Sequence, residues 1–143
     1  MVLAQVNPRG GVVTIDIEDH VDTVRMFPIV RDKVEFLLGG STDPEIVATV
    51  AERAKGKRVM VILGSDHSKE HVLAEMASYA PMVSVGSYLI VQDTGGVMIR
   101  DPNPGPRRAV EEFLANDGRF EPDRSRERML FTMHPKGYLR RAR

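Results

Sequence analysis

Short apolar runs alternate along this chain with longer segments in which apolar residues recur every three or four positions. The runs span residues 12–17, 34–40, 58–64 and 87–93, and glycine or acidic residues close them. Runs this short and apolar are typical of strands that are covered on both faces in a parallel sheet. A buried helix can give a similar run, but the short length and the bounding glycines favour strands.

Helices are predicted between these strands. Residues 42–57 begin with a Thr-Asp-Pro capping signal, and Gly56 is placed to end the helix in the left-handed conformation. Residues 68–80 and 106–117 each place their apolar side chains on one stripe of a helix. This alternation predicts an α/β fold with a doubly wound, mostly parallel sheet.

The C-terminal part has a different pattern. An extended polar piece precedes an apolar stretch at residues 129–133, a turn at 134–137 and a last strand at 138–141, which together predict an antiparallel pair. Three alternating arginines in the polar piece indicate one face of a strand, paired with nearby acids rather than binding an anion; they are Arg124, Arg126 and Arg128. We interpret His20 and His134 as solvated.

Composition narrows the class of protein. A length of 143 residues favours a single domain spanning residues 1–143. Twenty basic and 20 acidic residues cancel, so we expect neither nucleic acid nor a membrane as a partner. The absence of cysteine excludes disulfides, thiolate metal sites and a cysteine nucleophile. We find no signal peptide and no run near the ~20 apolar residues of a membrane span, so we expect a cytoplasmic protein.

Polar residues follow each predicted strand. Asp16 ends the first strand, residues 40–42 follow the second, residues 64–67 follow the third, and Asp93 ends the fourth. In open α/β sheets, ligands bind outside the carboxyl ends of the strands, so these residues are candidates for a binding site. Two interpretations of Asp16 stay open: it holds the ribose of a nucleotide-type cofactor, or it caps a helix.

The order of these strands, caps and polar ends resembles the cephalosporin hydroxylase / rhamnosyl O-methyltransferase family. The resemblance runs from about Val12 to the C-terminus and is most specific in "DHSKEHVLAEMASYAPMVSVGSYLIVQD", residues 66–93. It implies a Rossmann-like sheet of the methyltransferase class and S-adenosylmethionine (SAM) as the cofactor. It also implies a small-molecule substrate, in which a hydroxyl of a sugar or a natural product accepts the methyl group.

The resemblance also implies roles for particular residues. Asp16 corresponds to the acid that holds the SAM ribose, while Gly40, Ser41 and Thr42 line the adenosine pocket. His67 matches the histidine of the family signature and is the candidate catalytic base, since imidazole exchanges protons near neutral pH. For the histidine four residues further on, at position 71, we favour a packing or surface role.

Two departures from the family concern its metal site. The family signature has an aspartate where this chain has Gly64, and it has a Glu-Asp pair where this chain has Gln92 and Asp93. Only Asp93 remains of these three carboxylates, with Asp66 nearby as a substitute ligand or a helix cap. Mg²⁺ prefers hard, charged oxygen ligands, so we do not expect it to bind tightly here.

A third departure concerns the N-terminus. The glycine-rich SAM loop of the family, and the strand before it, lie upstream of the region that aligns with Met1. We therefore expect a sheet that lacks its first strand, between residues 12–17 and 58–64. Either these strands pair directly, or another chain covers their edges in a homo-oligomer, or the sequence is a truncated part of a longer protein.

The residues and the family resemblance leave three hypotheses for the function. SAM-dependent methyl transfer is favoured, and a non-catalytic relic or partner-completed half-domain is the alternative. A nicotinamide-dependent oxidoreductase would also use an acid at Asp16, but the chain contains no Gly-x-Gly-x-x-Gly motif.

Overall fold

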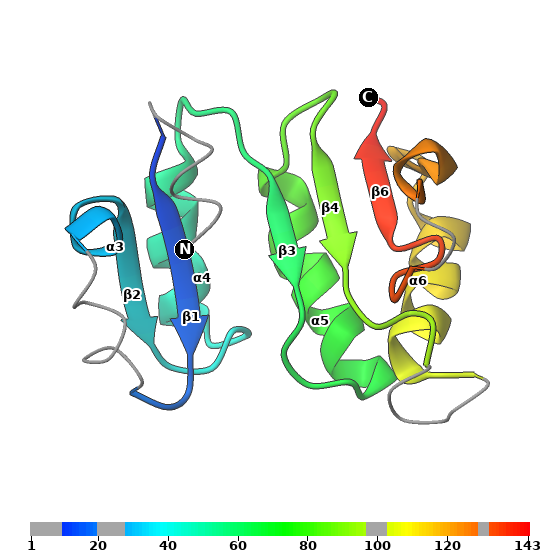
Figure 1. Ribbon diagram of the computed structural model, residues 1–143, viewed down its shortest axis with the longest axis horizontal. Coiled ribbons are helices and arrows are strands. Elements are labelled where there is room, and N and C mark those ends of the chain that lie inside the picture. Colours follow the sequence, from blue (N-terminus) through cyan, green and yellow to red (C-terminus); the bar gives the residue numbers. More distant parts are fainter. Residues whose placement is uncertain (1–9, 20–27, 97–102, 129–131) are drawn as a thin grey trace. The chain divides into compact units, whose positions relative to one another are not determined.

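Two compact units make up the chain, Met1–Glu52 and Arg53–Arg143. The computed structural model describes residues 10–19, 28–96, 103–128 and 132–143, whose elements are labelled in Figure 1. A single domain spanning residues 1–143 stays a prediction.

The first unit contains a parallel strand pair. β1 (Val12–Asp16) pairs in parallel with β2 (Val34–Leu38), and α4 (Pro44–Ala54) follows β2 after a short turn. The structure confirms both predicted strands and this helix. A further helix, α3 (Pro28–Lys33), leads directly into β2. The sequence pattern did not reveal α3, because six residues are too few to show a helical period.

The second unit contains a four-stranded sheet in the order β3-β4-β6-β5. β3 (Val61–Leu63) and β4 (Tyr88–Val91) are parallel, whereas β6 (Tyr138–Arg141) is antiparallel both to β4 and to β5 (Phe120–Pro122). The chain is therefore a mixed α/β protein with the predicted C-terminal antiparallel pair. Among the described residues, β6 pairs with β4 and β5. The apolar stretch at residues 129–133, which the sequence placed before the turn, lies mostly outside the described residues, since 129–131 are not described.

Two helices cover one face of this sheet. α5 (Lys69–Tyr79) continues into a short 3-10 helix, η1 (Ala80–Met82), and α6 (Gly105–Asn116) packs against α5 (Figure 1). Within the described residues, no helix combines the length and the apolar character needed to cross a bilayer.

The core of the second unit lies between these helices and the sheet. Leu89 of β4 and Leu139 of β6 are directly opposite in register, and neither is exposed to solvent. Met76 of α5 is equally buried, and Val110 of α6 is 1% exposed. These residues belong to the apolar stripes and runs that the sequence predicted, so the core follows from the hydrophobic pattern.

The polar piece after β5 differs from the prediction. Arg124–Arg126 forms a 3-10 helix, η2, instead of an extended strand, because the Asp123 carboxylate accepts a hydrogen bond from the Ser125 amide and caps the turn. The predicted pairing with acids is confirmed, since Arg124 Nε lies 2.7 Å from Glu127 Oε1 and Arg126 Nε lies 3.3 Å from Asp123 Oδ2.

Candidate functional site

The loop between β3 and α5 is shaped by local hydrogen bonds. Asp66 Oδ1 accepts a hydrogen bond from the Ser68 amide at 2.6 Å, and Ser68 is itself the N-cap of α5. The hydrogen bonds from Ser68 lower the pKa of the Asp66 carboxyl, with a smaller contribution from nearby histidines. Asp66 thus closes a turn on its own loop, and this turn includes the next residue, His67.

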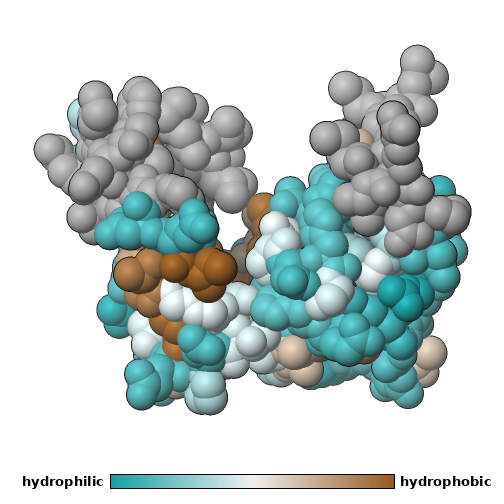
Figure 2. Space-filling view, turned by 90° about the horizontal axis from the view of Figure 1, so that it is seen from below, coloured by the Kyte–Doolittle hydropathy of each residue, from teal (hydrophilic) through white to brown (hydrophobic). Residues whose placement is uncertain are grey.

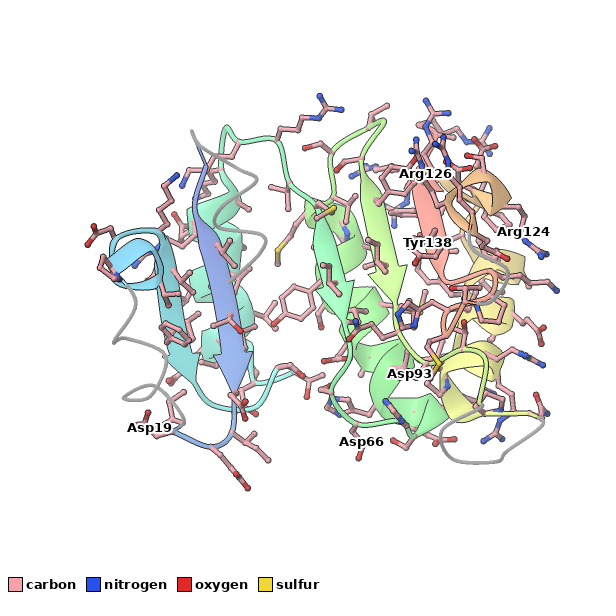
Figure 3. The ribbon with its side chains drawn as sticks, viewed as in Figure 1. Asp19, Asp66, Asp93, Arg124, Arg126 and Tyr138 are labelled. Carbon is pink, nitrogen blue, oxygen red and sulfur yellow. The ribbon has the colours of Figure 1, made fainter. Side chains whose placement is uncertain are left out.

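His67 lies beside Asp93, which is in the turn after β4. His67 Nε2 and Asp93 Oδ2 are 3.4 Å apart, and about a third of each side chain is exposed. Figure 3 shows Asp66 and Asp93 at the end of the second unit where β3 and β4 finish. A carboxylate beside an imidazole orients the ring and stabilises its protonated form, so the pair can work as a general base.

The backbone of Asp93 is held in an unusual conformation. Its φ angle is 55°, in the left-handed region that few non-glycine residues occupy and that aspartate tolerates better than most. The Asp93 amide donates a hydrogen bond to His134 Nδ1 at 2.8 Å. His134 is half-buried, so its interpretation as a solvated residue is wrong, while His20 lies outside the described residues. Strained residues of this kind cluster at functional sites.

Neighbouring contacts fix the same turn. Thr94 is fully buried, and its hydroxyl donates to the Pro135 carbonyl at 2.7 Å. Arg107 of α6 donates from Nε to the Thr94 carbonyl at 3.0 Å. The position of Asp93 therefore depends on α6 and on the turn before β6, two segments that are distant in sequence and that the pattern of motifs did not connect.

The first turn of α6 also contacts the His67 loop. A Cβ atom on Gly105 would lie 2.1 Å from the His67 carbonyl oxygen and 2.8 Å from the Lys69 amide, so only glycine fits. Lys69, the first residue of α5, also contacts α6: its Nζ lies 2.6 Å from Oε2 of Glu112. Both residues of the His67–Asp93 pair are thus positioned by α6.

The residues present do not fit Mg²⁺. A side chain at Gly64 would begin 2.0 Å from Gln92 Oε1, which means that the Gln92 amide already fills the space of a ligand at position 64. Within the described residues, no three His, Asp or Glu side chains lie together as a metal site. Asp66 is engaged by Ser68 and Asp93 lies beside His67. A neutral amide and one carboxylate that already contacts His67 are a poor donor set for this ion.

In the first unit, the ends of β1 and β2 bring other predicted residues together. The Gly39 amide donates to the Asp16 carbonyl at 2.8 Å, and the Gly40 amide donates to Asp43 Oδ2 at 2.9 Å. The turn that contains Ser41 and Thr42 therefore starts beside Asp16. Asp16 is exposed, with Oδ1 accepting from the Glu18 amide and Oδ2 left without a hydrogen-bond partner among the described residues.

Two apolar residues at this end were missed by the sequence analysis. Ile17 is 75% exposed and Leu38, directly opposite Asp16 in the strand register, is 63% exposed. Figure 2 shows hydrophobic side chains gathered on the surface of the first unit at this end. Large exposed apolar residues beside a polar turn suit a planar apolar ligand group. The signal in the sequence was their position directly at the strand ends.

The predicted site residues thus form two sets. Asp16 lies with residues 40–42 in the first unit, while His67 lies with Asp93 in the second; Asp66 is held on its own loop.

Comparisons with known proteins point to one family. The family described as "Rhamnosyl O-methyltransferase/CmcI" matches residues 1–142 of the chain. A rhamnosyl O-methyltransferase of Mycobacterium tuberculosis (strain ATCC 25618 / H37Rv) is 36% identical over 115 residues, covering 74% of this chain and 46% of the relative. A rhamnosyl O-methyltransferase of Mycobacterium leprae (strain TN) is 33% identical over 147 residues, covering 96% of this chain and 62% of the relative. The chain therefore spans between about half and three fifths of the length of these relatives.

Proposed function

Because the chain belongs to the rhamnosyl O-methyltransferase/CmcI family, we propose that it functions in SAM-dependent methyl transfer to a hydroxyl of a sugar or small natural product. The observation that carries this proposal is the His67–Asp93 pair beyond β3 and β4, which supplies a base for a hydroxyl. The relatives are named for a rhamnosyl substrate, so a rhamnoside is the first acceptor to test.

We propose that the first unit binds the adenosyl part of SAM. Asp16 Oδ2, which has no hydrogen-bond partner among the described residues, suits the ribose hydroxyls, and the turn of Gly40, Ser41 and Thr42 offers small residues and backbone groups beside it. Ile17 and Leu38 offer apolar surface for the adenine ring. SAM, when bound, supplies a methyl group on a positively charged sulfur, so the protein needs to align the acceptor rather than activate the donor.

His67 is the proposed base for the acceptor. With Nε2 facing Asp93, the Nδ1 atom would take the proton of the acceptor hydroxyl. The hydroxyl oxygen would gain the methyl group as the carbon–sulfur bond of SAM breaks, and the sulfur would leave as a neutral thioether. Asp93 then stabilises the imidazolium through its carboxylate. We assign no step to a metal, because Gly64 and Gln92 do not provide a ligand set for one.

The proposed fold is a Rossmann-like methyltransferase sheet that lacks its first strand. Among the described residues, β1 pairs with β2 alone and β3 pairs with β4 alone, so each has one edge without a partner. Unpaired edges favour association with another strand, which supports a homo-oligomer.

A second candidate is a non-catalytic binding module or a half-domain that a partner completes. Gly64 and Gln92, in place of two family acids, favour this candidate, because a reaction that needs the metal would not proceed without its ligands. It predicts binding of SAM or of a partner without methyl transfer.

Titration calorimetry with SAM tests the proposal. We expect saturable binding that weakens about tenfold or more in Asp16→Ala, as expected for the loss of a charged hydrogen bond to ribose. Asp19→Ala, three residues further on, is the matched control and should bind normally. No binding of SAM at millimolar concentration contradicts the proposal.

Methyl transfer to methyl rhamnoside, followed with labelled SAM, separates the two candidates. Under the enzyme proposal, His67→Gln keeps SAM affinity and lowers the rate by about a hundredfold or more. Binding without transfer across a panel of sugar and natural-product acceptors supports the binding module.

Metal dependence gives an independent check. We expect EDTA or added Mg²⁺ to change the methyl-transfer rate by less than about twofold, since the donor set does not fit the ion. A rate that falls sharply in EDTA and returns with Mg²⁺ contradicts this assignment.

A further inference from the structure

Ser65, in the loop that carries His67, is linked to two side chains of α5. Its hydroxyl donates a hydrogen bond to Glu75 Oε1 at 2.7 Å, and its Oγ lies 3.1 Å from His71 Nε2. His71 and Glu75 are one helical turn apart, with His71 Nε2 3.6 Å from Glu75 Oε1. The loop is therefore connected to the helix by a three-residue network that the proposed reaction does not use.

The direction of each hydrogen bond follows from the number of protons. A serine hydroxyl has one proton, and a carboxylate can only accept. The Ser65 hydroxyl therefore donates its one hydrogen bond to Glu75. Ser65 Oγ must then accept from His71, which places a proton on His71 Nε2. Each member has one defined role, so the network fixes where Ser65 lies relative to α5.

Burying Glu75 has a considerable energetic cost. The residue is 2% exposed, and its Oε2 atom has no hydrogen-bond partner among the described residues. Tyr79, one turn further along, is kept neutral because burial, and then the charge of Glu75, raise its pKa to about 12. Buried carboxylates are destabilising unless both oxygens are well paired. Glu75 has a partner for only one of its oxygens among the described residues, so a contribution to stability does not explain its presence here.

We propose that Ser65 is a positioning residue, which uses Glu75 and His71 of α5 to hold His67 against Asp93. The loop is then fixed from both sides, by this network and by Gly105 of α6 against the His67 carbonyl. The role of His67 as the base rests on the proposed function, whereas its orientation by Ser65 does not. Only the hydroxyl of Ser65 can carry this role, because it both donates to Glu75 and accepts from His71.

Nitrogen NMR of the histidine rings tests the orientation without any activity assay. In the native protein, the contact with Asp93 should keep the proton of neutral His67 on Nε2. Ser65→Ala should replace this single form by a mixture of the two tautomers, and Ser65→Thr should restore it. His134, whose Nδ1 accepts from the Asp93 amide, gives an internal reference.

Ser78→Ala is the matched control, since among the described residues the hydroxyl of this serine on α5 donates only to the Ala74 carbonyl of its own helix. It should leave the His67 signals unchanged. His71→Ala changes a partly exposed position, so folding is expected to survive, and it serves as a second variant with the same expected tautomer mixture. The proposal is overturned when His67 keeps one tautomer in both Ser65→Ala and His71→Ala.

Kinetics then connect the orientation to turnover. Ser65→Ala should lower kcat for methyl transfer by about tenfold through misplacement of the base, with SAM affinity within about twofold of the native value. If Ser65→Ala lowers the stability but leaves kcat per folded molecule unchanged, the role of Ser65 is purely structural. That result overturns its proposed effect on turnover. If the native chain transfers no methyl group, the proposed function fails while the NMR result still decides the role of Ser65.

Discussion

At Gly105 the absence of a side chain lets α6 contact the backbone of the loop that carries His67. Helix propensity favours alanine over glycine by about 1 kcal/mol inside a helix, but Gly105 is the first residue of α6, where this gain does not apply in full. The new Cβ would instead meet the His67 carbonyl oxygen, and overpacking of this kind costs about 1–3 kcal/mol or more. We therefore expect Gly105→Ala to lower the free energy of unfolding, measured in urea, by that amount.

The control for this substitution is Gly11→Ala, where the added Cβ would have only ordinary contact with the Lys33 carbonyl at 3.5 Å. It should change the stability by less than about 0.5 kcal/mol. Equal stability of the Gly105 variant and the native protein would show that the loop and α6 are not in close contact.

Asp123 makes the stability of the fold depend on pH in the acidic range. Hydrogen bonds from the hydroxyls of Ser125 and then Tyr88 hold the pKa of its carboxyl far below the usual range. A lowered pKa stabilises the folded state fully above the ordinary value of ~3.9, and this contribution is lost as the pH falls through the folded value. Asp123→Asn should therefore be less stable than the native protein at neutral pH, and the difference should narrow below about pH 4.

Urea unfolding at neutral pH and at several acidic values measures this difference. Glu121→Gln, an exposed neighbour paired loosely with Arg140 at 3.8 Å, is the control and should change the stability little. A difference between Asp123→Asn and the native protein that stays constant down to acidic pH would contradict the assignment.

At the scale of the elements, α5 is the helix that joins the core to the site. Met76 is fully buried on its inner stripe, and truncation of such a side chain costs about 2–5 kcal/mol. We expect Met76→Ala to lower the free energy of unfolding by this amount. Met60→Ala is the matched control, since Met60 is 45% exposed, and it should cost less than about 1 kcal/mol. Similar losses for both variants, seen in thermal or urea unfolding, would contradict the placement of the core.

The elements were largely predictable from the sequence because hydrophobic periodicity determines them. The four parallel-type strands, α4, α5 and α6 were all expected, and Gly56 has the expected left-handed φ of 67°. α3 was missed because it is too short to show a helical period, and local hydrogen bonding explains the change at residues 124–126. The Asp123 side chain accepts a hydrogen bond from the Ser125 amide and so stabilises η2. Hydrophobic periodicity does not predict such hydrogen bonds between an aspartate and the nearby backbone.

The site was predictable only in part. Asp16, His67 and Asp93 were singled out because polar residues at strand ends are candidates for a binding site. The structure brings His67 and Asp93 together in the second unit, while Asp16 lies in the first. The roles of His134 and Gly105 depend on contacts between distant segments, and a single sequence carries no signal for those. Whether Gln92 leaves room for a ligand at position 64 is likewise a matter of side-chain packing, which the strand pattern does not determine.

At the scale of the whole molecule, the unpaired strand edges predict self-association. Within the described residues β3 pairs with β4 alone, and Ile62 of this strand is 39% exposed. Light scattering after size exclusion should show a homo-oligomer, and Ile62→Lys should shift it towards the monomer, because edge charges oppose strand pairing. Val85→Lys, at a 61% exposed position in a turn, is the control. A native protein that is monomeric at all concentrations would contradict the prediction.

The strand order of the second unit has a consequence for synthesis of the chain. β6 is an inner strand, between β4 and β5, although it is the last of the four to be made. Roughly 50 residues separate the end of β4 from the end of β6, and ribosomes working at about 5–20 residues per second need several seconds to add them. During that interval β4 lacks its β6 partner, so neighbouring nascent chains on one messenger RNA are most prone to pair with each other before β6 has been made.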